Sequence, residues 1–195
     1  DKNDIFELDS NCKHSENILF SIDKLLEDMD LSIKDNDSFG VVIGPGSFTG
    51  IRIAISLVKG LIAGDSKKKL VTLTSLELMA YTYINQYKPT TEFVCVIDAL
   101  SGLYFVCQFD KEGNKIGQER MITQEELINL DINIVGLSEE NVPCKIKITP
   151  SAQDLLDICQ TKITKNELSK EEDLLPLYLR KSQAEVSLEE KLKKK

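Results

Sequence analysis

The sequence predicts an α/β protein built from two subdomains. Segments with the periodicity of amphipathic helices alternate with short apolar runs that are typical of strands. This pattern changes near residue 90, and a length of 195 residues suits one large domain or two small halves. We therefore expect an N-terminal subdomain over residues 1–88, a C-terminal subdomain over residues 89–186 and a charged tail over residues 187–195.

Three helices and two strands are expected in the first half. Ser15 is a residue type that caps helix N-termini, and the helix after it carries a single apolar stripe of about 100°. Residues 39–43 and 70–73 read as buried strands, with a long apolar helix between them from about residue 51 to residue 63. Thr74 and Glu77 have the spacing of a capping box and begin the third helix.

The second half is expected to be richer in strands. Residues 93–97 and 103–109 read as strands, followed by a hairpin loop into residues 115–119. Thr123 and Glu126 predict the cap of a short helix that ends at Leu130. Brief strands over residues 132–135 and 145–148 precede a helix that begins at Ser151 and ends near Lys162.

Composition excludes several classes of function. The 24 basic and 32 acidic side chains give a net charge of −8, which disfavours unaided binding of nucleic acid. Five scattered cysteines without a CxxC pair predict reduced thiols, and a single histidine, His14, excludes a histidine-rich metal site. No apolar run approaches the roughly 20 residues that span a bilayer, so we expect a cytoplasmic protein without a membrane partner.

A glycine-rich loop joins the first expected strand to the long apolar helix. Its spacing is GxGxxxG, whereas a dinucleotide site requires GxGxxG and a P-loop requires Lys directly after the last glycine. The loop is therefore either a phosphate cradle at a helix N-terminus or a tight strand-to-helix turn. Its residues are Gly44, Pro45, Gly46, Ser47, Phe48, Thr49 and Gly50, with Arg52 following in the helix.

The helix after this loop is more apolar than one core contact requires. Its apolar residues cover an arc of about 200°, while a single core contact uses about 100°. Two interpretations remain open from this pattern: the helix is buried between two layers of its own domain, or its additional face binds a partner.

Several of these motifs resemble the signature of the TsaB (YeaZ) family of bacterial tRNA-modification proteins. The resemblance runs from about residue 5 to residue 182 and is most specific at the loop and helix over residues 44–54, which continue to Lys59, Gly60 and Leu61. Four further motifs match in order: His14-Ser15-Glu16, Thr74-Ser75-Leu76-Glu77, Ile97-Asp98-Ala99 with Tyr104, and Pro176-Leu177-Tyr178-Leu179-Arg180.

The resemblance implies an actin-like, Hsp70-like ATPase fold (ASKHA fold) without a catalytic apparatus of its own. Family members act in forming threonylcarbamoyladenosine in tRNA as the non-catalytic partner of the TsaD subunit. The implied partners are therefore a TsaD-like catalytic subunit, a TsaE-like ATPase, a second copy when the chain is alone, and tRNA only through the complex. No metal or cofactor is implied for this chain alone, and a nucleotide at the partner interface is left open.

The sequence departs from the family pattern at two places. Leu100 stands where the family has Arg, which weakens the expectation of a charged site in that hairpin. The short hairpin with which family members open has no counterpart before Asp1, so we expect it to be missing. The competing interpretation is a small ATP-dependent phosphotransferase or peptidase of the same fold, with Asp98 as its acid and His14 as a weaker candidate for a base.

Pairing is expected through the first two helices. The additional apolar arc of the second helix lies beside two of its glycines, which permit close approach of another helix, although its opposite edge at Ile55 and Ile62 is also apolar. The predicted interface residues are Ile18 and Ile22 on the first helix, and Ile53, Leu57, Gly60 and Gly64 on the second.

Overall fold

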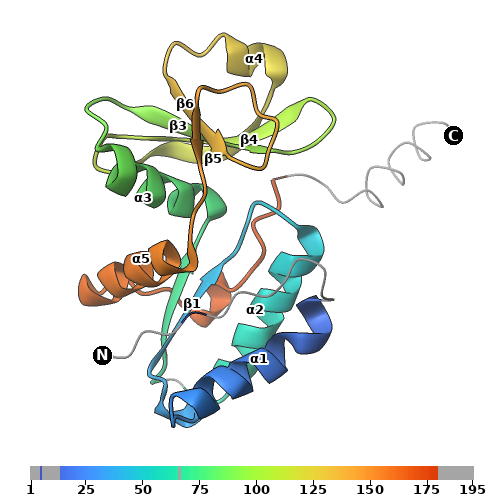
Figure 1. Ribbon diagram of the computed structural model, residues 1–195, viewed down its shortest axis with the longest axis vertical. Coiled ribbons are helices and arrows are strands. Elements are labelled where there is room, and N and C mark those ends of the chain that lie inside the picture. The colour runs from blue at the N-terminus through green and yellow to red at the C-terminus, as the bar shows by residue number, and fades with distance from the viewer. Residues whose placement is uncertain (1–4, 6–13, 66, 180–195) are drawn as a thin grey trace, which may run out of the picture.

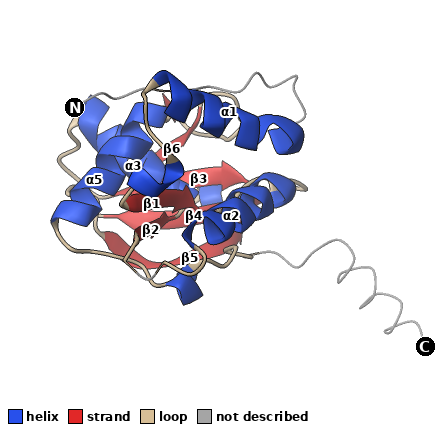
Figure 2. Ribbon diagram, turned by 90° about the horizontal axis from the view of Figure 1, so that it is seen from below, coloured by secondary structure: helices blue, strands red, loops and turns tan. Residues whose placement is uncertain are grey.

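The computed structural model describes residue 5, residues 14–65 and residues 67–179 of the chain. Within these ranges the chain forms two sheets with helices packed on their faces (Figures 1 and 2). The predicted tail over residues 187–195 lies outside the described residues. None of the helices in the described ranges is long and apolar enough to cross a membrane.

The smaller sheet has two parallel strands, β1 (Ser38–Val42) and β2 (Lys69–Leu73). Helix α2 (Phe48–Ile62) connects them and covers one face, where its buried Ile55 and Val58 pack with Val41 and Leu70. Helix α5 (Ala152–Thr164) covers the other face through Ile158 and Cys159. A side chain on Gly40 would collide with the Cys159 thiol, so glycine lets α5 approach β1 closely.

The larger sheet has five strands in the order β5-β4-β3-β6-β7. The hairpin strands β3 (Phe93–Asp98), β4 (Leu103–Phe109) and β5 (Lys115–Thr123) are antiparallel, while β6 (Asn133–Leu137) and β7 (Ile146–Ile148) continue the sheet in parallel with β3. Helix α3 (Ser75–Tyr87) packs on one face around Phe93 and Phe109, and α4 (Gln124–Ile128) packs on the other through Leu127.

Helix α1 (His14–Asp28) lies beside α2, at the opposite end of the molecule from α4 (Figure 1). The predicted cap at Ser15 is wrong, because the helix already includes His14. The side chains of residues 14–17 lie outside the description, and the role expected for His14 remains a prediction.

Two segments distant from β2 in sequence complete the smaller sheet. Helix α5 packs on it, and Ser169 forms an antiparallel bridge with Leu70. The division predicted at residue 88 separates the two subdomains by their order along the chain. In space, α5 and the segment after it pack against the smaller sheet, which the N-terminal half forms.

Candidate interaction site

The glycine-rich loop forms a tight connection between β1 and α2. Helix α2 begins at Phe48, three residues earlier than expected, because the Ser47 hydroxyl accepts a hydrogen bond from the Gly50 N–H at 3.3 Å and caps the helix. Gly44 has a φ of +108°, and a Cβ there would lie 2.9 Å from Cδ1 of Ile51. The Gly44 carbonyl accepts a hydrogen bond from the Ser75 N–H at 2.9 Å, which joins the loop to the start of α3.

An arginine and two aromatic rings meet at the start of α2. The Arg52 Nε donates a hydrogen bond to the Tyr178 hydroxyl at 2.6 Å. The Phe48 and Tyr178 rings stack with centroids 5.3 Å apart, and the Arg52 guanidinium carbon lies 3.9 Å from the Phe48 centroid. We call these three residues the Arg52 clasp. These residues belong to separate motifs of the family resemblance. The hydrogen bond between Arg52 and Tyr178 joins positions 126 residues apart.

The two sides of α2 have different environments. Ile55, Val58 and Ile62 are buried against the smaller sheet, whereas Ile53 and Leu57 are only half-buried. An added Cβ at Gly60 would meet no atom within 4 Å. The edge of α2 with Ile55 and Ile62 therefore faces the core.

Gly64 does not lie on this helix face. Helix α2 ends at Ile62 with Ala63 as its C-cap, and Gly64 follows with a φ of +79°. The expectation that Gly64 lies on the interface face of the helix is wrong, because this glycine supplies the left-handed conformation after the helix end. A substitution there would strain the backbone whether or not a partner is present.

Helix α1 adds exposed apolar side chains next to α2. Leu19 is exposed, and Phe20 is 71% exposed, whereas Ile18 and Ile22 are half-buried. Both views place α1 and α2 side by side (Figures 1 and 2). An exposed large aromatic residue beside a half-buried apolar helix face is a surface suited to another protein.

The Asp98 carboxylate closes a turn. Its Oδ1 accepts a hydrogen bond from the Leu100 N–H at 2.7 Å, and the Asp98 N–H donates to Glu140 Oε2 at 2.8 Å. Leu100, Ser101 and Gly102 all have positive φ, and the Leu100 side chain is exposed. Burial raises the pKa of the Glu140 carboxyl, although the hydrogen bond from Asp98 lowers it.

The described residues contain no group of three or more His, Cys, Asp or Glu side chains that could hold a metal ion. Their four cysteines are free, and burial raises the pKa of Cys107 and of Cys159 to about 11. Thiols with such pKa values are poor nucleophiles at neutral pH. Among the described residues these four cysteines form no disulfide, and three of them, Cys95, Cys107 and Cys159, are buried; Cys12 lies outside the described residues.

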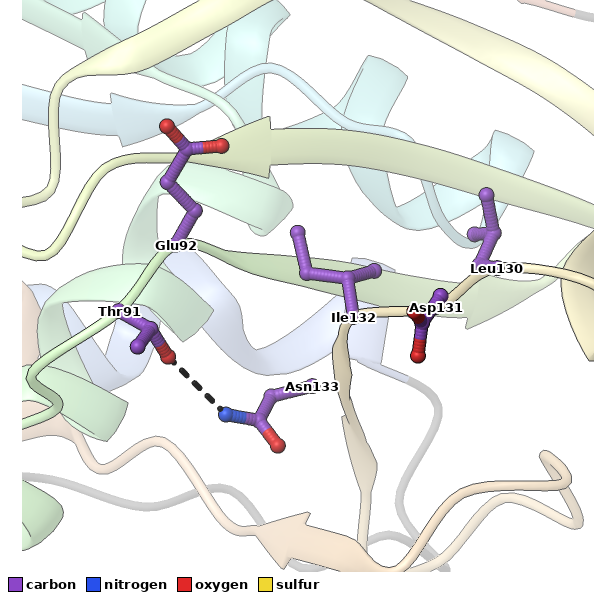
Figure 3. A pocket seen from close by; sticks show the side chains of 6 residues that line it. All are labelled: Thr91, Glu92, Leu130, Asp131, Ile132 and Asn133. Carbon is purple, nitrogen blue, oxygen red and sulfur yellow. Dashed lines mark hydrogen bonds between the residues drawn. The ribbon is translucent and has the colours of Figure 1, made fainter.

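A shallow cavity of about 600 Å³ lies beside the larger sheet (Figure 3). Thr91, Glu92, Asp131 and Asn133 line it together with two apolar residues, and Asn133 and Thr91 share a hydrogen bond of 3.3 Å. The cavity borders the first residues of the parallel strands β3 and β6. Ligand crevices in α/β sheets lie at the opposite, carboxyl ends of such strands, so this hollow does not have the position of a substrate site.

Comparison with solved structures establishes the fold. YeaZ from Pseudomonas aeruginosa superposes with a TM-score of 0.67 at 22% identity, covering 86% of each chain. A second Pseudomonas aeruginosa crystal structure, described as an uncharacterized protein with similarity to peptidase YEAZ, gives a TM-score of 0.67 at 23% identity and covers 86% of this chain and 84% of that one. The actin-like fold implied by the sequence motifs is confirmed.

Comparison of sequences establishes the family. A family model described as TsaD: tRNA N6-adenosine threonylcarbamoyltransferase matches residues 9–160. The tRNA threonylcarbamoyladenosine biosynthesis protein TsaB of Escherichia coli (strain K12) is 24% identical over 193 residues, which cover 88% of this chain and 83% of that protein. TsaB of Buchnera aphidicola subsp. Schizaphis graminum is 31% identical over 103 residues, about half of each protein. The chain therefore belongs to the family described by the TsaD model and, within it, to the TsaB (YeaZ) group.

Proposed function

We propose that this chain acts in the biosynthesis of threonylcarbamoyladenosine in tRNA, as a non-catalytic subunit that pairs with a TsaD-like transferase. Relatives named for this biosynthesis support the pathway. A tRNA N6-adenosine threonylcarbamoyltransferase from Kosmotoga olearia is 29% identical over 135 residues, which cover 67% of this chain and 40% of that protein. This chain is thus similar both to TsaB proteins and to a transferase. The similarity supports a pairing in which two related folds contact each other through equivalent helices.

The observation that carries the proposal is the outward face of α1 and α2. Ile53 and Leu57 are half-buried on the side of α2 opposite the core, and Gly60 leaves the backbone open to close approach. On the neighbouring α1, Ile18 and Ile22 are half-buried, and Leu19 and Phe20 are exposed. A TsaD-like helix pair is the proposed occupant, and a second copy of this chain occupies the same face when the chain is alone.

Other partners reach the chain through this complex. A net charge of −8 supports recruitment of tRNA by the complex and not by the isolated chain. A TsaE-like ATPase completes the set of partners, and any nucleotide binds at the shared interface. No metal or cofactor is assigned to this chain itself.

The test is co-expression with the cognate TsaD-like subunit, followed by an assay for modified tRNA. We expect the two chains to co-purify, and we expect modification to require both. Absence of association, or full modification without this chain, would overturn the proposal.

The enzyme alternative is tested on the isolated chain. The turn-closing contact of Asp98 gives its carboxylate a structural role, so we expect ATP turnover at background level. Turnover that disappears in Asp98→Asn would favour the phosphotransferase or peptidase interpretation over the subunit one.

A further inference from the structure

The segment over residues 169–179, here called the C-terminal strap, runs along the smaller sheet. The Ser169 N–H donates to the Leu70 carbonyl at 2.8 Å, and the Thr72 N–H donates to the Ser169 hydroxyl at 2.9 Å. The Leu177 N–H then donates to the Ile43 carbonyl at 2.8 Å. The strap therefore reaches from β2 to the end of β1, next to the glycine-rich loop.

The strap supports α2 from behind. The Leu174 side chain is fully buried and belongs to the same apolar cluster as Ile55, Val58 and Ile62. These three residues form the inner face of α2, opposite the half-buried Ile53. Leu174 thus anchors the strap without any contribution from the Arg52 clasp.

The Arg52 clasp joins the strap to the first two turns of α2. Phe48 and Arg52 are four residues apart and share one side of the helix, where the Tyr178 ring and hydroxyl contact both. The clasp lies at the surface, since Phe48 is 43% and Tyr178 is 48% exposed. Because so little area is buried there, the clasp adds little to the hydrophobic core, but it restrains a helix end that would otherwise fray.

We propose that Tyr178 is a positioning residue for partner pairing, which it assists by fixing the start of α2 through Arg52 and Phe48. Residue Ile53, the first on the outward face, directly follows Arg52. A surface that is ordered before association loses less conformational freedom when it binds. This inference rests on the proposed function, because it concerns pairing through the face of α1 and α2.

The experiment compares the Tyr178→Phe variant with the unsubstituted protein. The variant keeps the stacked ring and removes the hydroxyl that accepts from Arg52. Tyr87→Phe makes the same change at an exposed tyrosine at the end of α3 and is the matched control. Two quantities are measured for each protein: amide hydrogen exchange over residues 49–53, and the dissociation constant for the TsaD-like subunit and for a second copy.

We expect Tyr178→Phe to accelerate exchange at the start of α2 and to weaken association by at most about tenfold, because the lost hydrogen bond lies within the chain and acts on association only by ordering the helix. The thermal midpoint should stay near that of Tyr87→Phe, because Leu174 still anchors the strap. Arg52→Lys, which keeps the charge but lacks the Nε donor, should weaken association by a similar factor. The double variant should lose less than the sum of the two single ones, since both remove the hydrogen bond between Arg52 and Tyr178.

Three results would overturn the inference while leaving the proposed function intact, and the first two come from exchange and association. One is unchanged exchange over residues 49–53 in Tyr178→Phe, and the other is faster exchange with unchanged association. A fall in the thermal midpoint that accounts for the weaker association would also overturn it, since Tyr178 would then be a general structural contact. If the unsubstituted chain pairs with neither partner, the proposed function fails, and the inference fails with it.

Discussion

At the scale of single residues, Gly44 occupies a backbone conformation that other residues rarely adopt. Its φ is +108°, and a Cβ would come within 2.9 Å of the Ile51 side chain. We expect Gly44→Ala to lower the free energy of unfolding by about 1–3 kcal/mol, because backbone strain adds to the collision. Urea denaturation measures the difference.

Gly60→Ala is the control for this change. Gly60 lies in α2, and an added Cβ would meet no atom within 4 Å. Alanine there should raise the free energy of unfolding by up to about 1 kcal/mol, since it favours the helix. Equal stability of the Gly44→Ala variant and the unsubstituted protein would contradict our account of the loop.

Glu140 gives the stability of the protein a predictable pH dependence. Burial raises the pKa of its carboxyl above the ordinary value of 4.5 in spite of the hydrogen bond from Asp98. A raised folded pKa stabilises the fold below the unfolded pKa, and this contribution is lost as the pH rises through the folded pKa. Relative to the unsubstituted protein, Glu140→Gln should therefore gain stability as the pH rises above 4.5.

Urea denaturation at pH values on either side of 4.5 would test this, with Glu27→Gln at an exposed position of α1 as the control. Parallel pH profiles for the Glu140→Gln variant and the unsubstituted protein would show that the carboxyl does not titrate as described.

Local contacts between residues were predictable, and distant ones were not. The capping boxes predicted at Thr74 and Thr123 are confirmed, and Ser151 caps α5 in the same way, because these hydrogen bonds join residues three positions apart. The Arg52 clasp was not predictable, because nothing in the local pattern of Arg52 or Tyr178 specifies the other residue.

At the scale of elements, the types of helix and strand followed from periodicity, whereas their ends depended on pairing and caps. Strand β5 extends to Thr123 instead of ending at Glu119, because its pairing with β4 continues as far as Leu103. The periodicity of α2 predicted its apolar faces. It placed the end of the helix near residue 63 but did not exclude Gly64 from the interface face, because glycine at a helix end and glycine on a helix face look alike in sequence.

The proposed partner face of α2 leads to a prediction at this scale. A leucine at Gly60 would place a side chain where the proposed partner helix approaches, while the core face with Ile55 stays intact. We expect Gly60→Leu to weaken pairing by at least about 2 kcal/mol, the range of interface hot spots, and to leave the monomer folded. Size-exclusion chromatography and circular dichroism separate these effects.

Lys59→Ala, on the polar side of the same helix, is the control and should pair almost normally. Normal pairing by Gly60→Leu would place the contact elsewhere, and unfolding of that variant would show that Gly60 faces the protein interior.

At the scale of the whole molecule, the end of the described chain returns to close the smaller sheet. Neighbouring leucines make this testable, since Leu174 is fully buried and Leu175 is 61% exposed. We expect Leu174→Ala to cost about 2–5 kcal/mol of unfolding free energy, the range for a leucine removed from a core. Leu175→Ala should change it by no more than about 0.5 kcal/mol.

Urea denaturation of the two variants provides the comparison, and equal losses would contradict the packing of the strap.

The alternation of helices and strands predicted the α/β class. The return of α5 and the strap to β2 was not predictable, because order along the chain does not specify which sheet a late segment joins.

The charge of the whole molecule leads to the last prediction, which concerns tRNA. Contacts with phosphate supply most non-specific affinity for nucleic acid and make it sensitive to salt. With a net charge of −8, the isolated chain should bind tRNA weakly, and binding should appear only when the TsaD-like partner is added. A mobility-shift titration of the chain alone, the partner alone and the two together measures each contribution. Tight, salt-sensitive binding by the isolated chain would mean that a local basic surface outweighs the net charge, and that the chain itself recruits the tRNA.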